Sequence, residues 1–157
     1  MRQNIIDYGI GLILVVWLAG CAINDPVAVS KKRQITDGIA NKRWKALRVE
    51  EAGVLVYQEG KTDNLFPGYR NYELQFTGSR IKLTEFTKET FEGDWSISQQ
   101  GSRVYLVLQN LTPIPTETQG ELEYEVYQFD DSQMTLVATK TNRKTGNTIN
   151  TYTLVPQ

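Results

Sequence analysis

Residues 121–129 read ELEYEVYQF, and apolar and acidic side chains alternate along most of this stretch. Leu122, Tyr124 and Val126 fall on one face, while the three glutamates between and before them fall on the other. Because successive side chains of a β-strand point to opposite faces of the sheet, this alternation predicts an antiparallel strand with one buried and one solvated face. Residues 91–98, FEGDWSIS, repeat the alternation of apolar and polar side chains.

The same period of two extends in both directions from these segments and predicts eight consecutive strands. They are expected at residues 44–57, 69–76, 80–86, 91–98, 103–110, 121–129, 133–140 and 148–155, with a bulge near Gly53 in the first. Most of the connections are short turns. The expected fold is therefore all-β, an eight-stranded antiparallel up-and-down barrel that closes on itself and leaves no exposed edge. A β-sandwich is the alternative, although it requires longer crossover connections than most of these.

The beginning of the chain predicts a lipid anchor. An apolar stretch at residues 10–19 is too short to span a bilayer, which takes roughly 20 apolar residues. It runs into Leu18-Ala19-Gly20-Cys21, which resembles the lipobox of bacterial lipoproteins. That resemblance implies cleavage before Cys21 and attachment of a diacylglyceryl group to its sulfur. An uncleaved membrane helix with an incidental cysteine is the alternative.

The anchor divides the chain into three parts. We expect a signal peptide at residues 1–20, a lipidated N-terminus and polar linker at residues 21–41, and the barrel domain at residues 42–157. Ala22 follows the cysteine, and by analogy with other lipoproteins this favours a lipid-anchored protein of the cell envelope, at the outer membrane. Within the linker, Lys31-Lys32-Arg33 either contacts anionic headgroups or forms a solvated spacer, and three charges alone favour the spacer.

Composition excludes several kinds of chemistry. The 157 residues contain no histidine and one cysteine, so Ser-His-Asp triads, Cys-His pairs and intrachain disulfides are ruled out. A zinc site built on histidine and cysteine is ruled out as well. The net charge is −1, and the aromatic residues alternate with acids, a pattern that disfavours nucleic acid as a partner. We therefore expect no enzymatic activity, no catalytic residue, no metal and no cofactor.

The barrel segment as a whole resembles the lipocalin-like domains of many bacterial lipoproteins. Lys42-Arg43-Trp44-Lys45 at the first strand, Phe91-Glu92-Gly93-Asp94-Trp95, the closing Tyr152-Thr153-Leu154 and a long first loop carry the resemblance. It implies that Trp44 plugs the closed end of the barrel and that a small molecule binds inside. The glycine usually found two residues before that tryptophan is replaced by Lys42.

Two charged residues fall on the expected inner face. Glu85 shares the parity of Ile81 and Leu83, and Arg48 shares that of Trp44. A charge inside a barrel is costly unless it is paired or lies in a wet mouth. One interpretation makes them ligand-binding residues together with Tyr72, Tyr124 and Tyr152. The other places them at strand ends in solvent, or displaces them by a bulge.

The expected function is that of a membrane-anchored, non-enzymatic binder or carrier of a small apolar or amphipathic ligand. The alternative is a solid barrel that serves as a protein-interaction or envelope-assembly module. Bulky residues such as Phe76, Phe91 and Trp95 on the inner face favour the alternative, because an eight-stranded barrel is just wide enough to be filled by side chains. The expected partners are the membrane, a small hydrophobic ligand or an envelope protein.

Overall fold

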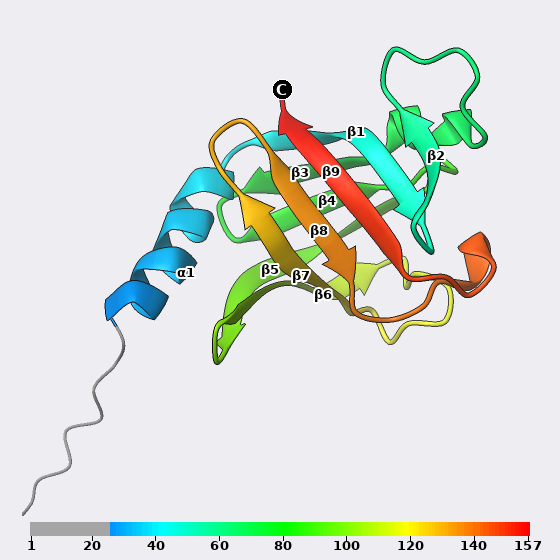
Figure 1. The fold of residues 1–157 in the computed structure, drawn as a ribbon. Helices are drawn as coiled ribbons and strands as arrows, with labels where there is room; N and C mark the ends of the chain where they lie inside the picture. Colours follow the sequence, from blue (N-terminus) through cyan, green and yellow to red (C-terminus); the bar gives the residue numbers. More distant parts are fainter. Residues whose placement is uncertain (1–25) are drawn as a thin grey trace, which may run out of the picture.

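The computed structural model describes residues 26–157 and shows one helix followed by strands (Figure 1). The helix is α1 (Pro26–Ile39), and two short 3-10 helices, η1 (Pro67–Asn71) and η2 (Arg143–Thr145), lie in connections. The strands are β1 (Arg43–Glu51), β2 (Val54–Gln58), β3 (Glu73–Thr77), β4 (Arg80–Thr84), β5 (Thr90–Gln100), β6 (Arg103–Thr112), β7 (Leu122–Phe129), β8 (Met134–Ala138) and β9 (Asn150–Pro156).

Eight of these strands form a closed antiparallel barrel, and the fold predicted from the alternation is confirmed. Each strand from β3 to β9 pairs with the next, β3 pairs with β1, and β9 returns to pair with β1 from Trp44↔Pro156 to Glu51↔Asn150. β2 is an additional strand that pairs with β1. The barrel has no crossover connection because consecutive strands are neighbours, as the short turns predicted.

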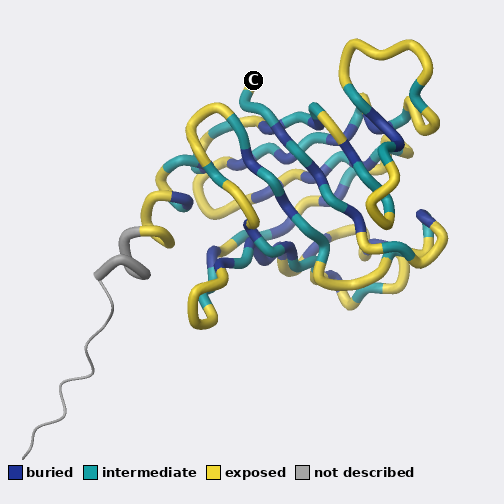
Figure 2. The backbone as a smooth tube through the Cα atoms, viewed as in Figure 1, coloured by how far each residue is buried: buried dark blue, intermediate teal, exposed yellow. Residues whose placement is uncertain are grey.

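The apolar residues of the alternating pattern face the inside of the barrel, and the polar residues face the outside. In β4 the burial alternates at every residue, with Ile81 and Leu83 inside, and β3 places Leu74 and Phe76 beside them. Figure 2 shows buried residues distributed along the strands and exposed residues gathered in the turns and in the loop after β2. Large apolar side chains fill much of the interior, which is the packing expected for eight strands.

The expectation of one long strand at residues 44–57 is wrong. Ala52 and Gly53 have φ values of 49° and 79°, and this pair of positive values reverses the chain into the β1–β2 hairpin. A two-residue turn of this hand matches the twist of the flanking strands. β2 lies beside the C-terminal half of β1 and β3 beside its N-terminal half, with residues 59–72 as an excursion between them.

The excursion after β2 is also where the expected second strand begins too early. Residues 67–71 form η1 instead of the first part of a strand, and Tyr69 within it is fully buried. Gly68 allows a close approach here, because a Cβ at this position would lie 2.9 Å from the carbonyl oxygen of Phe86. The side-chain amide of Asn71 donates hydrogen bonds to the carbonyl oxygens of Gly68 and Phe86. η1 therefore fills the wall between β2 and the β4–β5 turn.

The segment expected to be a linker contains α1, which lies at one end of the barrel (Figure 1). Ile35 and Ile39, one helical turn apart, are 1% and 0% exposed, and Gly38 lies against the ring of Phe129. We call this end, with the β3–β4, β5–β6 and β7–β8 turns, the α1 end. Trp44 is fully buried near it, with its ring centroid 5.9 Å from that of Phe129. In residues 26–157 no helix is long and apolar enough to cross a membrane.

Candidate functional site

The opposite end of the barrel contains a pocket of about 480 Å³. The long β6–β7 connection (residues 113–121) and the β8–β9 connection (residues 139–149) form its walls, and we call this the loop end. The pocket reaches down to Tyr124 and Tyr152 on the inner face of the barrel and to Glu85 at the end of β4. Its volume lies within the range of small-molecule sites in proteins, roughly 300–1,000 Å³.

Stacked tyrosines form the floor of the pocket. The rings of Tyr72 and Tyr152 stack with centroids 4.5 Å apart and planes 15° apart, and Tyr124 meets Tyr152 edge-on at 6.0 Å. The hydroxyl groups of Tyr72 and Tyr124 are 3.4 Å apart, which is a weak hydrogen bond. Only Tyr124 and Tyr152 line the pocket, and Tyr72 lies behind them. Tyr69 extends this aromatic cluster and donates a 2.7 Å hydrogen bond to Glu51.

Burial keeps these phenols protonated. It raises the pKa of Tyr124 to about 12, although the hydrogen bond with Tyr72 acts in the opposite direction. Burial also raises the pKa values of Tyr72 and Tyr152 well above 10, and neighbouring tyrosine hydroxyls and the carboxylate of Glu85 add to the effect. A phenolate is therefore unavailable at neutral pH. The hydroxyl groups can donate and accept hydrogen bonds but do not act as bases.

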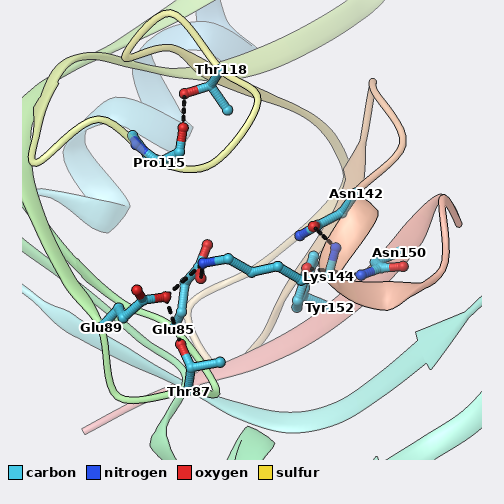
Figure 3. Close-up of polar contacts among 9 residues, drawn as sticks. All are labelled: Glu85, Thr87, Glu89, Pro115, Thr118, Asn142, Lys144, Asn150 and Tyr152. Atoms are coloured by element: carbon cyan, nitrogen blue, oxygen red, sulfur yellow. Dashed lines mark hydrogen bonds and ion pairs between the residues drawn. The ribbon is translucent and has the colours of Figure 1, made fainter.

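A partly buried ion-pair group lies at the rim of the pocket (Figure 3). Lys144 of η2 extends across the end of the barrel, and its Nζ is 2.5 Å from Glu85 and 2.6 Å from Glu89. Glu85 is only 7% exposed. Desolvation lowers the pKa of Lys144, but its hydrogen bonds to the two carboxylates outweigh this and raise it overall. The hydrogen bonds from Lys144 and Thr87 lower the pKa of Glu89.

A second polar network positions η2. Asn150 is fully buried and donates a 3.3 Å hydrogen bond to the hydroxyl of Tyr152. Thr145 and Thr148 complete the network around its side chain. The side chain of Asn142 accepts a hydrogen bond from the backbone N–H of Lys144 and so caps the start of η2. These contacts fix the loop that presents Lys144 to the pocket.

The structure brings four of the five proposed ligand-binding residues together. Glu85, Tyr124 and Tyr152 line the pocket, and Tyr72 contacts the two tyrosines from below. Arg48 does not join them. A bulge between Ala46 and Arg48 shifts the register with β9, so that Arg48 points outward and pairs with Glu50 on the outer surface. The inner-face assignment of Arg48 is therefore wrong.

Sequence reasoning missed Lys144 and Asn150. Asn150 did carry a signal, because it lies two residues before Tyr152 and so shares its inward parity. Lys144 carried none, since it lies in a turn far along the chain from Glu85. Trp44 lies near the α1 end, away from the pocket, and Cys21 lies outside the described residues. Among residues 26–157, no group of three or more His, Cys, Asp or Glu side chains is arranged to hold a metal ion.

Comparison with known proteins leaves the fold and the pocket as the basis for a functional proposal. No protein-family model, curated protein or solved structure matches this chain. The barrel is compatible with a binding protein and with an interaction module.

Proposed function

We propose that this protein is a lipid-anchored, non-enzymatic carrier that binds one small amphipathic molecule in the pocket at the loop end. The pocket itself is the observation that carries the proposal. Side chains fill the middle of the barrel, and α1 packs against one end. The other end keeps a cavity of about 480 Å³ above a floor of tyrosines. Most of the residues around this floor are polar or charged, so the pocket combines an aromatic bottom with polar walls.

The lining indicates an amphipathic ligand rather than a hydrocarbon. Tyr124, Tyr152 and Leu122 offer apolar surface at the bottom. The walls carry charges of both signs, including Lys144 and an Arg143–Glu117 ion pair with a 2.7 Å contact. A ligand with an apolar ring or chain and a polar head that both donates and accepts hydrogen bonds matches this distribution. A wholly apolar ligand would leave the charged rim desolvated without compensation.

Occlusion of the pocket tests the proposal. Ala138 lines the pocket at the end of β8, while Val137 does not line it and faces the outer surface of the barrel. We expect Ala138→Trp to weaken binding of the fluorescent amphiphile N-phenylnaphthylamine by about tenfold or more, the equivalent of roughly 1.4 kcal/mol. Val137→Trp is the matched control and should bind as the natural protein does. A fluorescence titration measures both.

Two outcomes would contradict the carrier proposal. One is that the natural protein shows no saturable binding of the probe and carries no small molecule in native mass spectrometry after mild extraction. The other is that the Ala138→Trp variant, folded by circular dichroism, binds as tightly as the Val137→Trp variant. In that case the probe binds elsewhere on the protein.

The anchor is tested separately. Because Cys21 is the only cysteine, Cys21→Ser removes the acceptor sulfur of the proposed lipid. We expect a precursor of higher mass that retains residues 1–20 and incorporates no labelled fatty acid, because lipid attachment to the sulfur precedes cleavage. An Ala22→Ser variant should be processed and labelled normally. Continued labelling and cleavage of the Cys21→Ser variant would show that the anchor proposal is wrong.

A protein-interaction module is the second candidate, and one observation favours it. Val54, Leu65 and Phe66 are 57%, 65% and 48% exposed, and they lie on β2 and the loop that follows it. β2 is also the one described strand outside the closed barrel. A module of this kind would bind a protein through this surface and leave the pocket empty. Substitution of Leu65 and Phe66 by serine would then abolish binding of that protein and leave probe binding unchanged.

A further inference from the structure

α1 carries three consecutive basic residues and lies close to the proposed anchor. Lys31, Lys32 and Arg33 are all exposed. Arg33 pairs with Asp37 one turn later, at 3.6 Å, whereas neither Lys31 nor Lys32 forms an ion pair with any described residue. Ile35 and Ile39 hold the C-terminal half of the helix against the barrel. The two lysines therefore have a fixed place in the fold and carry charge that is not neutralised locally.

Chain length places these lysines close to the membrane if Cys21 carries lipid. Four residues lie between Cys21 and Pro26, the first residue of α1, and the five residue-to-residue steps cover at most about 3.5 Å each, or roughly 17 Å in a fully extended chain. Lys31 follows after a rise of about 1.5 Å per helical residue. A helix tethered this closely keeps its positive charges within reach of the headgroup region, where electrostatic attraction extends over a Debye length of about 8 Å.

The position of the basic residues favours one orientation. Lys42 and Arg43 follow α1 and add to its positive charge at the α1 end, where the β7–β8 turn also contributes Asp130 and Asp131. The loop end carries charges of both signs around the pocket, with Glu117 paired to Arg143 and Glu85 paired to Lys144. An anionic bilayer therefore attracts the lysines of α1 rather than either end of the barrel as a whole. The β6–β7 and β8–β9 connections, whose residues line the pocket, lie at the end of the barrel away from α1 (Figure 1).

We propose that the basic segment of α1, formed by Lys31, Lys32 and Arg33, binds the surface of an anionic lipid bilayer. It thereby holds the barrel with the α1 end toward the membrane and the pocket toward the aqueous phase. The headgroup layer is the binding partner of this segment, and the phosphates of anionic lipids pair with the lysines. This inference rests on the lipid anchor of the proposed function and is independent of what the pocket binds.

Fluorescence resonance energy transfer from labels at two positions of the lipidated protein to dyes in the bilayer tests the orientation of the barrel. Once Cys21 is lipidated its sulfur is a thioether, so a single introduced cysteine can be labelled. Ser102, in the β5–β6 turn, reports on the α1 end, and Thr62, in the loop after β2, reports on the far side. The lipidated protein is reconstituted into phosphatidylcholine vesicles with or without phosphatidylglycerol, and acceptor dyes are carried on headgroups. We expect strong transfer from Ser102 and weak transfer from Thr62 on the anionic vesicles.

Charge reversal identifies the cause of the orientation. The double substitution Lys31→Glu and Lys32→Glu is expected to lower the population of molecules with α1 on the bilayer at least about tenfold. Energy transfer from the labels at positions 102 and 62 should then be equal, and high salt should have the same effect on the natural protein. Both positions are exposed, so the fold is retained, and circular dichroism verifies this. Lys61→Glu with Lys88→Glu makes the same change of charge at exposed positions away from α1 and should leave transfer unchanged.

The outcomes separate this proposal from the ones on which it rests. Equal transfer from both labels on anionic vesicles, or unchanged transfer after reversal of Lys31 and Lys32, overturns the docking of α1 while the anchor stands. Failure of the natural protein to float with vesicles overturns the anchor and the docking together. Loss of probe binding in the pocket has no bearing on transfer, because neither label lines the pocket.

Discussion

Replacement of Trp44 by alanine is expected to lower the free energy of unfolding by about 3–5 kcal/mol. The side chain is fully buried near the α1 end, and its ring contacts that of Phe129, which in turn lies against Gly38 of α1. Removal of the indole leaves a cavity that neither the barrel wall nor a helix fixed by two isoleucines can easily fill. Urea denaturation followed by circular dichroism measures the effect.

Two further variants separate packing at the α1 end from general effects on β1. The indole Nε1 of Trp44 forms no hydrogen bond with any described residue, so Trp44→Phe removes volume without breaking a bond and should cost much less than alanine. Arg48 lies on the same strand and its side chain is exposed, so Arg48→Met should change the free energy of unfolding by no more than about 0.5 kcal/mol. A cost below about 1 kcal/mol for Trp44→Ala would show that this residue does not plug the barrel.

Alkaline pH is expected to unfold the barrel through its tyrosines. Four tyrosines have pKa values raised chiefly by burial, that of Tyr124 to about 12; they are Tyr69, Tyr72, Tyr124 and Tyr152. In the unfolded chain they ionise near pH 10. Above that pH the unfolded state binds fewer protons than the folded state, so the free energy of unfolding falls as pH rises. Each tyrosine contributes about 1.4 kcal/mol per pH unit, and together they contribute on the order of 5 kcal/mol by pH 11.

The contribution of tyrosine ionisation is measured by the slope of the free energy of unfolding against pH, and not by its value at any one pH. Tyr152→Phe loses the hydrogen bond from Asn150 and is expected to be less stable at every pH. Its stability should nevertheless fall less steeply between pH 9 and 11, by about the share of one tyrosine. Denaturant titrations at several pH values measure the slope. If the natural protein and Tyr152→Phe have the same slope, the buried tyrosines are not the cause of alkaline unfolding.

The barrel could be predicted because half-buried strands constrain the sequence at every second residue. The alternation at residues 121–129 and 80–86 reappears as the burial of β7 and β4, and it correctly gave the inward direction of Glu85 and Tyr124. The hairpin at Ala52-Gly53 could not be predicted in the same way. An alanine at φ 49° is an uncommon choice for such a turn, which usually contains Asn-Gly or Asp-Gly.

The failures at Arg48 and α1 have distinct physical causes. A bulge inserts one residue and reverses the parity of everything after it, so the assignment of Trp44 was correct and that of Arg48 was not. α1 shows little helical periodicity, and its contact with the barrel depends on Ile35 and Ile39 alone among the described apolar side chains of the helix. Lys144 was missed because an ion pair between distant turns leaves no pattern in the sequence.

The seam between β1 and β9 has a consequence for how the chain folds. The first barrel strand, β1, finds one of its two neighbours within the barrel only in the last strand, β9 (Asn150–Pro156). Closing such a distant contact requires a large loss of chain entropy before any pairing compensates for it, and proteins dominated by such contacts fold slowly. The barrel therefore cannot close before β9 is available to pair. Until then, β1 and β8 each present an unpaired edge at the seam, and these two edges are the surfaces most open to incorrect strand pairing during folding.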